Sequence, residues 1–279
     1  MSAANIQSLL KESRVFKPAK AFTARARIQS LAQYRRLWKE SVQHPERFWK
    51  KQAEAELVWQ NPFTKWKAPF AKWFLGGKLN VSANCLHRWL GTATANKAAL
   101  IWEGEPAADG VPGEERTLTY AQLHREVCRF ANVLRRNGIA RGDRVILYLP
   151  MIPEAAIAML ACTRLGAVHS VVFGGFSAQS VADRIQDSGA KMVITAGGGY
   201  RRGAIVPLKK NVDDALQLTD AQGGSLTATI EKVIVVRRCG NEVHIREGRD
   251  VWWHRELEYV GDECPPAKLD SEAPLFILY

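Results

Sequence analysis

Two adjacent arginines after a run of glycines are the residues of this sequence best suited to bind a phosphate group. The stretch Gly197–Gly203 reads Gly-Gly-Gly-Tyr-Arg-Arg-Gly. A guanidinium group donates two parallel hydrogen bonds to phosphate oxygens, so the pattern predicts a flexible loop that presents two phosphate-binding side chains. A solvated loop with incidental arginines fits the pattern equally well. Lys209 and Lys210 follow at the start of a predicted helix, where a nearby anion would offset the unfavourable helix dipole.

A second turn with adjacent glycines comes directly after a predicted strand. The stretch Phe173–Ser177 contains Gly174 and Gly175. These glycines let a ligand approach the backbone, and Ser177 is suited to begin a helix. A bare tight turn is an equally good interpretation of a glycine pair.

Nucleophilic and metal-binding sites are not predicted. The sequence has no G-x-S-x-G, H-E-x-x-H or G-x-x-x-x-G-K-[ST] motif. His169 lies inside a predicted strand and is interpreted as a core histidine whose hydrogen bonds are satisfied. The five cysteines are dispersed and include no C-x-x-C pair, which favours neither a disulfide framework nor a zinc site. The chain is therefore predicted to hold no catalytic and no metal-binding residue.

The elements that position the two turns alternate between strands and helices. A capping box at Thr119 and Gln122 opens one helix, and Pro153 and Ser177 open the next two. A fourth helix is expected over 208–218. Strands are expected at 144–149, 167–173, 191–196, 232–236 and 274–279. Short connections between them indicate βαβ crossovers, so we expect an α/β fold with a largely parallel sheet and flanking helices. Ligands bind such sheets at the carboxyl ends of the strands.

The net charge of +11 is confined to the first 80 residues, which contain 16 Lys and Arg against 5 Asp and Glu. Residues 81–279 contain 23 of each and are neutral. A basic segment either contacts phosphates or wraps the main domain as a solvated layer.

Aromatic side chains in the basic segment favour the wrapping interpretation. One helical face is predicted from Ile28, Leu31, Tyr34, Trp38 and Val42, and a second short helix is expected over 46–55. Five tryptophans lie between positions 38 and 73, and large aromatic areas usually pin an extended segment onto a domain. The alternative is a binder of nucleic acid or an anionic surface, which a steep salt dependence of DNA binding would reveal.

Membrane and compartment signals are weak. No apolar run approaches the roughly 18 residues of a membrane span. Dispersed cysteines and the absence of a signal-peptide core predict a cytoplasmic protein. The acid-poor start, with Arg14, Arg25 and Arg27, leaves a mitochondrial matrix location as the alternative.

From about Tyr34 to Tyr279 the sequence resembles the N-terminal part of the AMP-forming acetyl-coenzyme A synthetases, in the acyl-adenylate-forming superfamily. The resemblance rests on Phe48-Trp49, on LNVSANCLHR from Leu79, and on WEGEP, LHREVCRFANVLRRNGI, GDRVILYLPMIPEAAIAMLAC, RLGAVHSVVFGGFSAQSVADRI, PLKKNVDDAL, EGRDVWW and PLFILY. It implies a basic, flexible N-terminus over 1–27, an extended Trp-rich cap over 28–92, and the first part of the AMP-binding domain over 93–279.

The activity implied by the resemblance is a two-step acetate–CoA ligation. Acetate and ATP give acetyl-adenylate and diphosphate, and the thiol of coenzyme A then displaces AMP. Propionate or another short acid is the alternative substrate. The resemblance places the phosphate loop, the acetate and ATP residues, the Mg²⁺ ligands and the catalytic lysine beyond Tyr279, so we expect this chain to be an N-terminal fragment, inactive alone. The oligomeric state stays open.

The resemblance also places one binding site inside the chain, for the nucleotide end of coenzyme A. Position by position, the site falls on Arg201, Arg202, Gly203 and Ala204. Neighbours of the adenine are expected at Phe173, Gly174, Val206 and Pro207. The family pattern has a second arginine at the position of Ala204, so the second phosphate contact depends on whether Arg202 replaces it.

Overall fold

The computed structural model describes residues 14–68, 72–108 and 110–279. The chain divides into two compact units, residues 1–56 and 57–279. The predicted cap segment, 28–92, therefore includes parts of both units. Within the described residues, no helix is both long and apolar enough to cross a membrane.

The first unit is helical. Its helices are α1 (Lys20–Arg25), α2 (Leu31–Gln43) and α3 (Pro45–Glu56). The backbone N–H of Gln33 donates to Ser30 Oγ at 3.1 Å, which caps the start of α2. Arg27 Nη2 donates to Glu56 Oε1 at 3.0 Å and joins the loop before α2 to the end of α3. The two helices predicted here are confirmed, although Ile28 precedes α2 instead of belonging to it.

The second unit is built around a six-stranded sheet in which every neighbouring pair is parallel. In spatial order its strands are β12 (Asp250–Trp252), β11 (Lys232–Val236), β8 (Met192–Ala196), β6 (Arg144–Leu149), β7 (Val168–Phe173) and β14 (Phe276–Ile277). The predicted α/β class is confirmed, and β6 and β11 have the predicted bounds. The strand predicted over 274–279 is shorter, because only Phe276 and Ile277 pair with β7 at the edge of the sheet.

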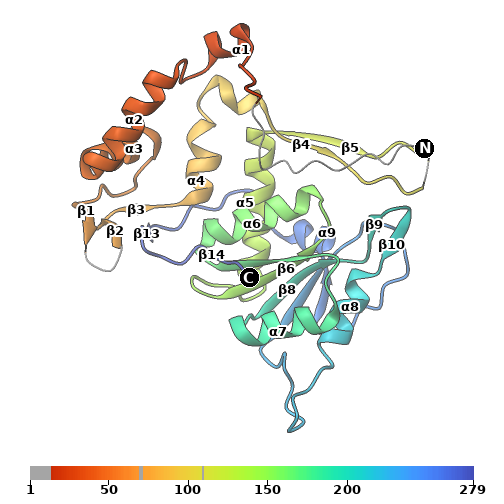
Figure 1. The fold of residues 1–279 in the computed structure, drawn as a ribbon. Coiled ribbons are helices and arrows are strands. Elements are labelled where there is room, and N and C mark those ends of the chain that lie inside the picture. The colour runs from red at the N-terminus through yellow and green to blue at the C-terminus, as the bar shows by residue number, and fades with distance from the viewer. Residues whose placement is uncertain (1–13, 69–71, 109) are drawn as a thin grey trace. The chain divides into compact units, whose positions relative to one another are not determined.

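Helices cover both faces of this sheet. Figure 1 shows α5 (Tyr120–Arg136) and α6 (Pro153–Leu165) on one face, and α7 (Ala178–Ser188) and α8 (Leu208–Ala215) on the other. The capping box predicted at Thr119 and Gln122 forms at the start of α5. Gly166 and Gly189 end α6 and α7 with positive φ angles of 79° and 60°. Helix α8 ends at Ala215, three residues before the predicted 218, where the chain enters a turn.

Short antiparallel pairs and helices complete the second unit and were not predicted. The pairs are β1 (Lys65–Ala68) with β2 (Lys72–Leu75), β3 (Lys78–Leu79) with β13 (Leu269–Asp270), β4 (Ala98–Glu103) with β5 (Glu115–Thr119), and β9 (Gly199–Arg201) with β10 (Ala204–Val206). The helices are α4 (Val81–Cys85), α9 (Trp253–Glu256) and the 3₁₀ turns His87–Trp89, Ala93–Asn96 and Leu257–Tyr259. Three of the five tryptophans between positions 38 and 73 lie in an aromatic cluster beside β1 and β2. The ring centres of Trp66 and Trp73 are 5.4 Å apart, and those of Trp59 and Phe74 are 5.7 Å apart.

The core lies between the sheet and its helices. Strands β6, β8 and β11 are buried along almost their whole length. Cys128 and Cys162 are buried as predicted, and all five cysteines are free. Tyr148 is completely buried, and its hydroxyl donates to the carbonyl of Phe176 at 2.7 Å. This bond fixes the turn after β7, which carries the predicted Phe173–Ser177 stretch.

His169 is buried in β7 as predicted, but the expectation that its hydrogen bonds are satisfied is wrong. Its Nδ1 has no hydrogen-bond partner. The ring lies 5.8 Å from that of Phe276 on the neighbouring strand, in surroundings that supply no partner for this atom. Burial lowers the pKa of His169 to about 4, so the ring is neutral near pH 7.

Candidate functional site

A cavity of about 340 Å³ opens where the parallel strands end. The turns after β6 and β7, the hairpin after β8, the residues after β11 and the end of β4 line it. The carboxyl edge of a parallel sheet is the usual ligand-binding position of such folds, because the loops there converge. Of the predicted site residues, the cavity brings together Phe173, Gly174, Arg201 and Val206.

The glycine- and arginine-containing stretch is a β-hairpin, so the predicted flexible loop is wrong. Strands β9 and β10 pair antiparallel, with Tyr200 opposite Ile205. The two turn residues, Arg202 and Gly203, have φ angles of 51° and 74°. Positive φ at both central residues is the geometry of a type I′ turn, whose twist matches that of paired strands. Ladder hydrogen bonds therefore hold Arg201 in place.

At two glycines here, an added side chain would force close neighbours to move. A Cβ at Gly199 would lie 2.8 Å from Pro150 Cβ, which would push the hairpin away from the turn after β6. A Cβ at Gly175 would collide with Arg201 Nη1 and would lie 2.8 Å from the ring of Phe173. Close packing explains both positions, without any need for chain flexibility.

Arg201 is the cation that the cavity presents most openly. Its Cζ lies 5.2 Å from the centre of the Phe173 ring, so the guanidinium lies across an aromatic face at the cavity wall. Within residues 14–68, 72–108 and 110–279, Arg201 makes no ion pair. A guanidinium that is positioned by a ring and lacks a counter-ion can receive an anion without breaking an existing pair.

The other predicted site residues lie outside the cavity. Arg202 is at the tip of the hairpin, where its backbone N–H donates to Glu105 Oε1 at 2.9 Å. Gly203 completes the turn, Ala204 pairs with Arg201 across the hairpin, and Pro207 precedes α8. The structure therefore does not bring the side chain of Arg202 to the cavity.

Among the cavity residues that were not predicted from the sequence, Arg238, Trp102 and Tyr200 form one cluster. Arg238 lies between two rings, with its Cζ 5.1 Å from the centres of both Trp102 and Tyr200. The indole of Trp102 donates to the carbonyl of Met151 at 2.7 Å. Arg238 Nη1 also pairs with Glu114 Oε1 at 2.9 Å. The available signal was position, because Arg238 comes two residues after β11 and so stands at the ligand-binding edge of the sheet.

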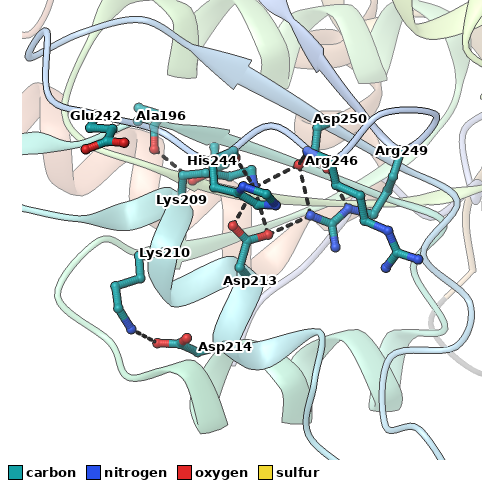
Figure 2. A network of polar contacts seen from close by, with 12 residues as sticks. Ala196, Lys209, Lys210, Asp213, Asp214, Glu242, His244, Arg246, Arg249 and Asp250 are labelled. Carbon is teal, nitrogen blue, oxygen red and sulfur yellow. Dashed lines mark hydrogen bonds and ion pairs between the residues drawn. The ribbon is translucent and has the colours of Figure 1, made fainter.

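The anions beside Lys209, which were expected to offset the helix dipole, are carboxylates of the chain itself. Lys209 is buried, and its Nζ donates to Asp213 at 2.7 Å, to the carbonyl of His244 at 3.0 Å and to Asp250 at 2.8 Å (Figure 2). Arg249 binds the same two carboxylates at 2.6 and 2.5 Å. Of the partners of Lys209, only Asp213 is near it in the sequence, so local spacing could not predict the whole network. Lys210 pairs with Asp214 at 2.6 Å on the surface of α8.

The network around Lys209 also sets the charge of Asp250. Burial alone would raise the pKa of this carboxyl, but hydrogen bonds from Arg249 and Lys209 outweigh burial and hold the pKa below its usual value. Two cations and two carboxylates thus join α8 to β12. This network supports the end of the hairpin that leads into α8.

Residues 87–279 match the family model described as AMP-binding enzyme. The chain belongs to the AMP-binding enzyme family. Residues 34–85 match a second model, described as acetyl-coenzyme A synthetase N-terminus. Both matches agree with the resemblance found in the sequence. They favour the enzyme hypothesis over a binder of nucleic acid or an anionic surface.

Curated relatives and a solved structure agree with this family. The chain is 45% identical over 281 residues to acetyl-coenzyme A synthetase of Rhodopirellula baltica, covering 100% of this chain and 41% of that protein. It is 50% identical over 279 residues to the protein of that name from Leptospira biflexa, covering 97% and 40%. The structure of acetoacetyl-CoA synthetase from Streptomyces lividans matches with a TM-score of 0.74 and 28% identity, over 93% of this chain and 38% of that one. The chain thus spans about two-fifths of the length of these relatives.

Proposed function

We propose that this chain belongs to an AMP-forming acetate–CoA ligase and that its cavity binds the adenosine nucleotide end of coenzyme A. The reaction is ATP, acetate and CoA to acetyl-CoA, AMP and diphosphate, through acetyl-adenylate. The names of the relatives support acetate as the acid. The observation that carries the CoA site is Arg201, whose guanidinium lies over Phe173 at the carboxyl edge of the sheet and makes no ion pair with the described residues. Free cysteines and the bacterial relatives support a cytoplasmic location.

In this proposal, the residues of the chain bind and orient the nucleotide. Arg201 forms charge-assisted hydrogen bonds to the 3′-phosphate, and Phe173, Gly174 and Val206 supply the flat apolar surface beside the adenine. ATP is proposed as the other nucleotide substrate of the ligase, and no residue of this cavity is assigned to it. Among the described residues, no group of three or more His, Cys, Asp or Glu is placed so that it could hold a metal ion.

Replacing Arg201 by alanine should weaken the binding of CoA to the chain about ten- to a hundredfold. The lost fork between a guanidinium and a phosphate at a partly exposed site is worth about 1.5–3 kcal/mol. Titration calorimetry of the purified chain with CoA and with dephospho-CoA measures the loss. The parent should prefer CoA, and the R201A variant should bind the two ligands about equally.

Arg202→Ala is the matched control, because it removes the same side chain one residue along, outside the cavity. We expect this variant to bind CoA as the parent does. If R201A discriminates against dephospho-CoA as strongly as the parent, the assignment of the 3′-phosphate to Arg201 is wrong. If instead R202A loses that discrimination, Arg202 is the phosphate-binding residue.

A further inference from the structure

Arg238 is a second guanidinium group in the cavity, and its surroundings differ from those of Arg201. Its side chain is only 10% exposed, and the rings of Trp102 and Tyr200 lie at equal distances from it. Its ionic partner, Glu114, has a side chain that is 67% exposed. The pair therefore joins a fixed, desolvated cation to a carboxylate that is largely in water.

The two members of this pair differ in what they lose on separation. Glu114 regains hydration when it leaves, because most of its side chain is already exposed. Arg238 regains little hydration because its side chain is only 10% exposed beside the two rings, and a largely buried guanidinium without an anion is costly. The site around Arg238 thus requires an anion but holds its present one weakly. A phosphate carries more charge than a carboxylate and accepts the same fork of hydrogen bonds.

Arg238 and Arg201 reach the cavity from different sides of the hairpin. Tyr200 and Arg201 are consecutive residues of β9, so their side chains leave the strand in opposite directions. Arg238 lies on Tyr200, and Arg201 lies on Phe173. The two guanidinium groups therefore belong to separate walls of one cavity, which suits a ligand with phosphates at two different positions.

We propose that Arg238 binds the 5′-phosphate of the nucleotide whose 3′-phosphate Arg201 binds, and that Glu114 occupies the Arg238 fork until the ligand displaces it. The inference rests on the proposed function, because it takes the ligand to be an adenosine nucleotide with a 3′-phosphate. It supplies a second phosphate contact in a chain that has alanine at position 204 and keeps the side chain of Arg202 outside the cavity.

Three adenosine nucleotides separate the two phosphate positions. Adenosine 3′,5′-bisphosphate, the 3′-monophosphate and the 5′-monophosphate are titrated into the full chain by calorimetry. In Arg238→Met, affinity for the bisphosphate should fall about five- to twentyfold, and the preference for it over the 3′-monophosphate should disappear. The preference over the 5′-monophosphate should remain. Arg201→Ala should show the opposite pattern.

Glu114→Gln tests the exchange of anions. The amide cannot compete as an anion, so the bisphosphate should bind this variant about two- to fivefold more tightly than the parent. The same substitution in the Arg238→Met background should have no effect on binding. A structural role for Arg238 would not produce this non-additive result.

The outcomes separate the inference from the function on which it rests. If R201A loses selectivity for the 3′-phosphate while R238M keeps selectivity for the 5′-phosphate, this inference is overturned and the proposed function stands. If the parent binds none of the nucleotides, both fail. Should R238M not fold by circular dichroism, Arg238→Lys keeps the charge without the fork and takes its place. Unchanged affinity in E114Q overturns the exchange in either case.

Discussion

Replacing Lys209 by methionine should lower the free energy of unfolding by about 3–5 kcal/mol. Methionine occupies a similar volume but leaves the carboxylates of Asp213 and Asp250 facing Arg249 alone. The side chain of Asp250 is 0% exposed, so its charge cannot be hydrated when Lys209 is removed. Urea unfolding followed by circular dichroism measures the change at neutral pH.

Arg164→Met is the matched control for this prediction. Arg164 is a cation as deeply buried as Lys209, with 2% of its surface exposed. Its Nε donates to the carbonyl of Cys264 at 2.5 Å, but in the described part of the chain it makes no ion pair. Its removal loses this hydrogen bond and a longer one from Nη1 to Ser82 Oγ at 3.5 Å but leaves no carboxylate without a cation, so we expect a loss of about 1–2 kcal/mol. Equal losses in the two variants would contradict the role assigned to the ion network.

Between pH 6.5 and 4, the free energy of unfolding of the His169→Leu variant should fall by about 3 kcal/mol less than that of the parent. In the folded chain, burial lowers the pKa of His169 to about 4, whereas an unfolded histidine has a pKa of about 6.5. Between these values the unfolded chain binds a proton that the folded chain does not. The depressed pKa therefore makes the folded state less stable as the pH falls through this window.

The measurement is the free energy of unfolding at several pH values, compared between parent and H169L. Leucine suits the site because His169 Nδ1 has no hydrogen bond to lose. His124 titrates in the same window in both proteins, since burial, then Arg164 and His87, lower its pKa to about 4. Only the difference between the two proteins reports on His169. His254→Gln, at an exposed position in α9, is the control, and curves of equal slope for H169L and parent would refute the prediction.

The parallel sheet could be predicted from the sequence because its signals are local. The capping box at Thr119, the proline at the start of α6 and the glycine after it each determine an element end within a few residues. The bounds of β6 and β11 follow from continuous apolar runs between polar residues. The family followed from long motifs, which the comparisons with known proteins confirm.

The cavity could be predicted only in part because its walls come from distant segments. Phe173 and Arg201 stand near strand ends and were found. Trp102 and Arg238 are far apart in the sequence, and no local pattern indicates that they stack. The hairpin was missed because its turn is Arg-Gly, whereas the usual signal for a type I′ turn is Asn-Gly or Asp-Gly.

The strand order also has a consequence for the sequence of folding events. Strands β6 and β7 pair across the single crossover helix α6, and β8 pairs with β6 after only α6, β7 and α7 have intervened, so closing these loops costs little chain entropy. Strand β14 also pairs with β7, but every element from α7 to β13 lies between these two strands in the sequence. Contacts between such distant segments form slowly. The centre of the sheet is therefore expected to assemble first and to act as the template on which β14 docks last, as the slowest phase of refolding.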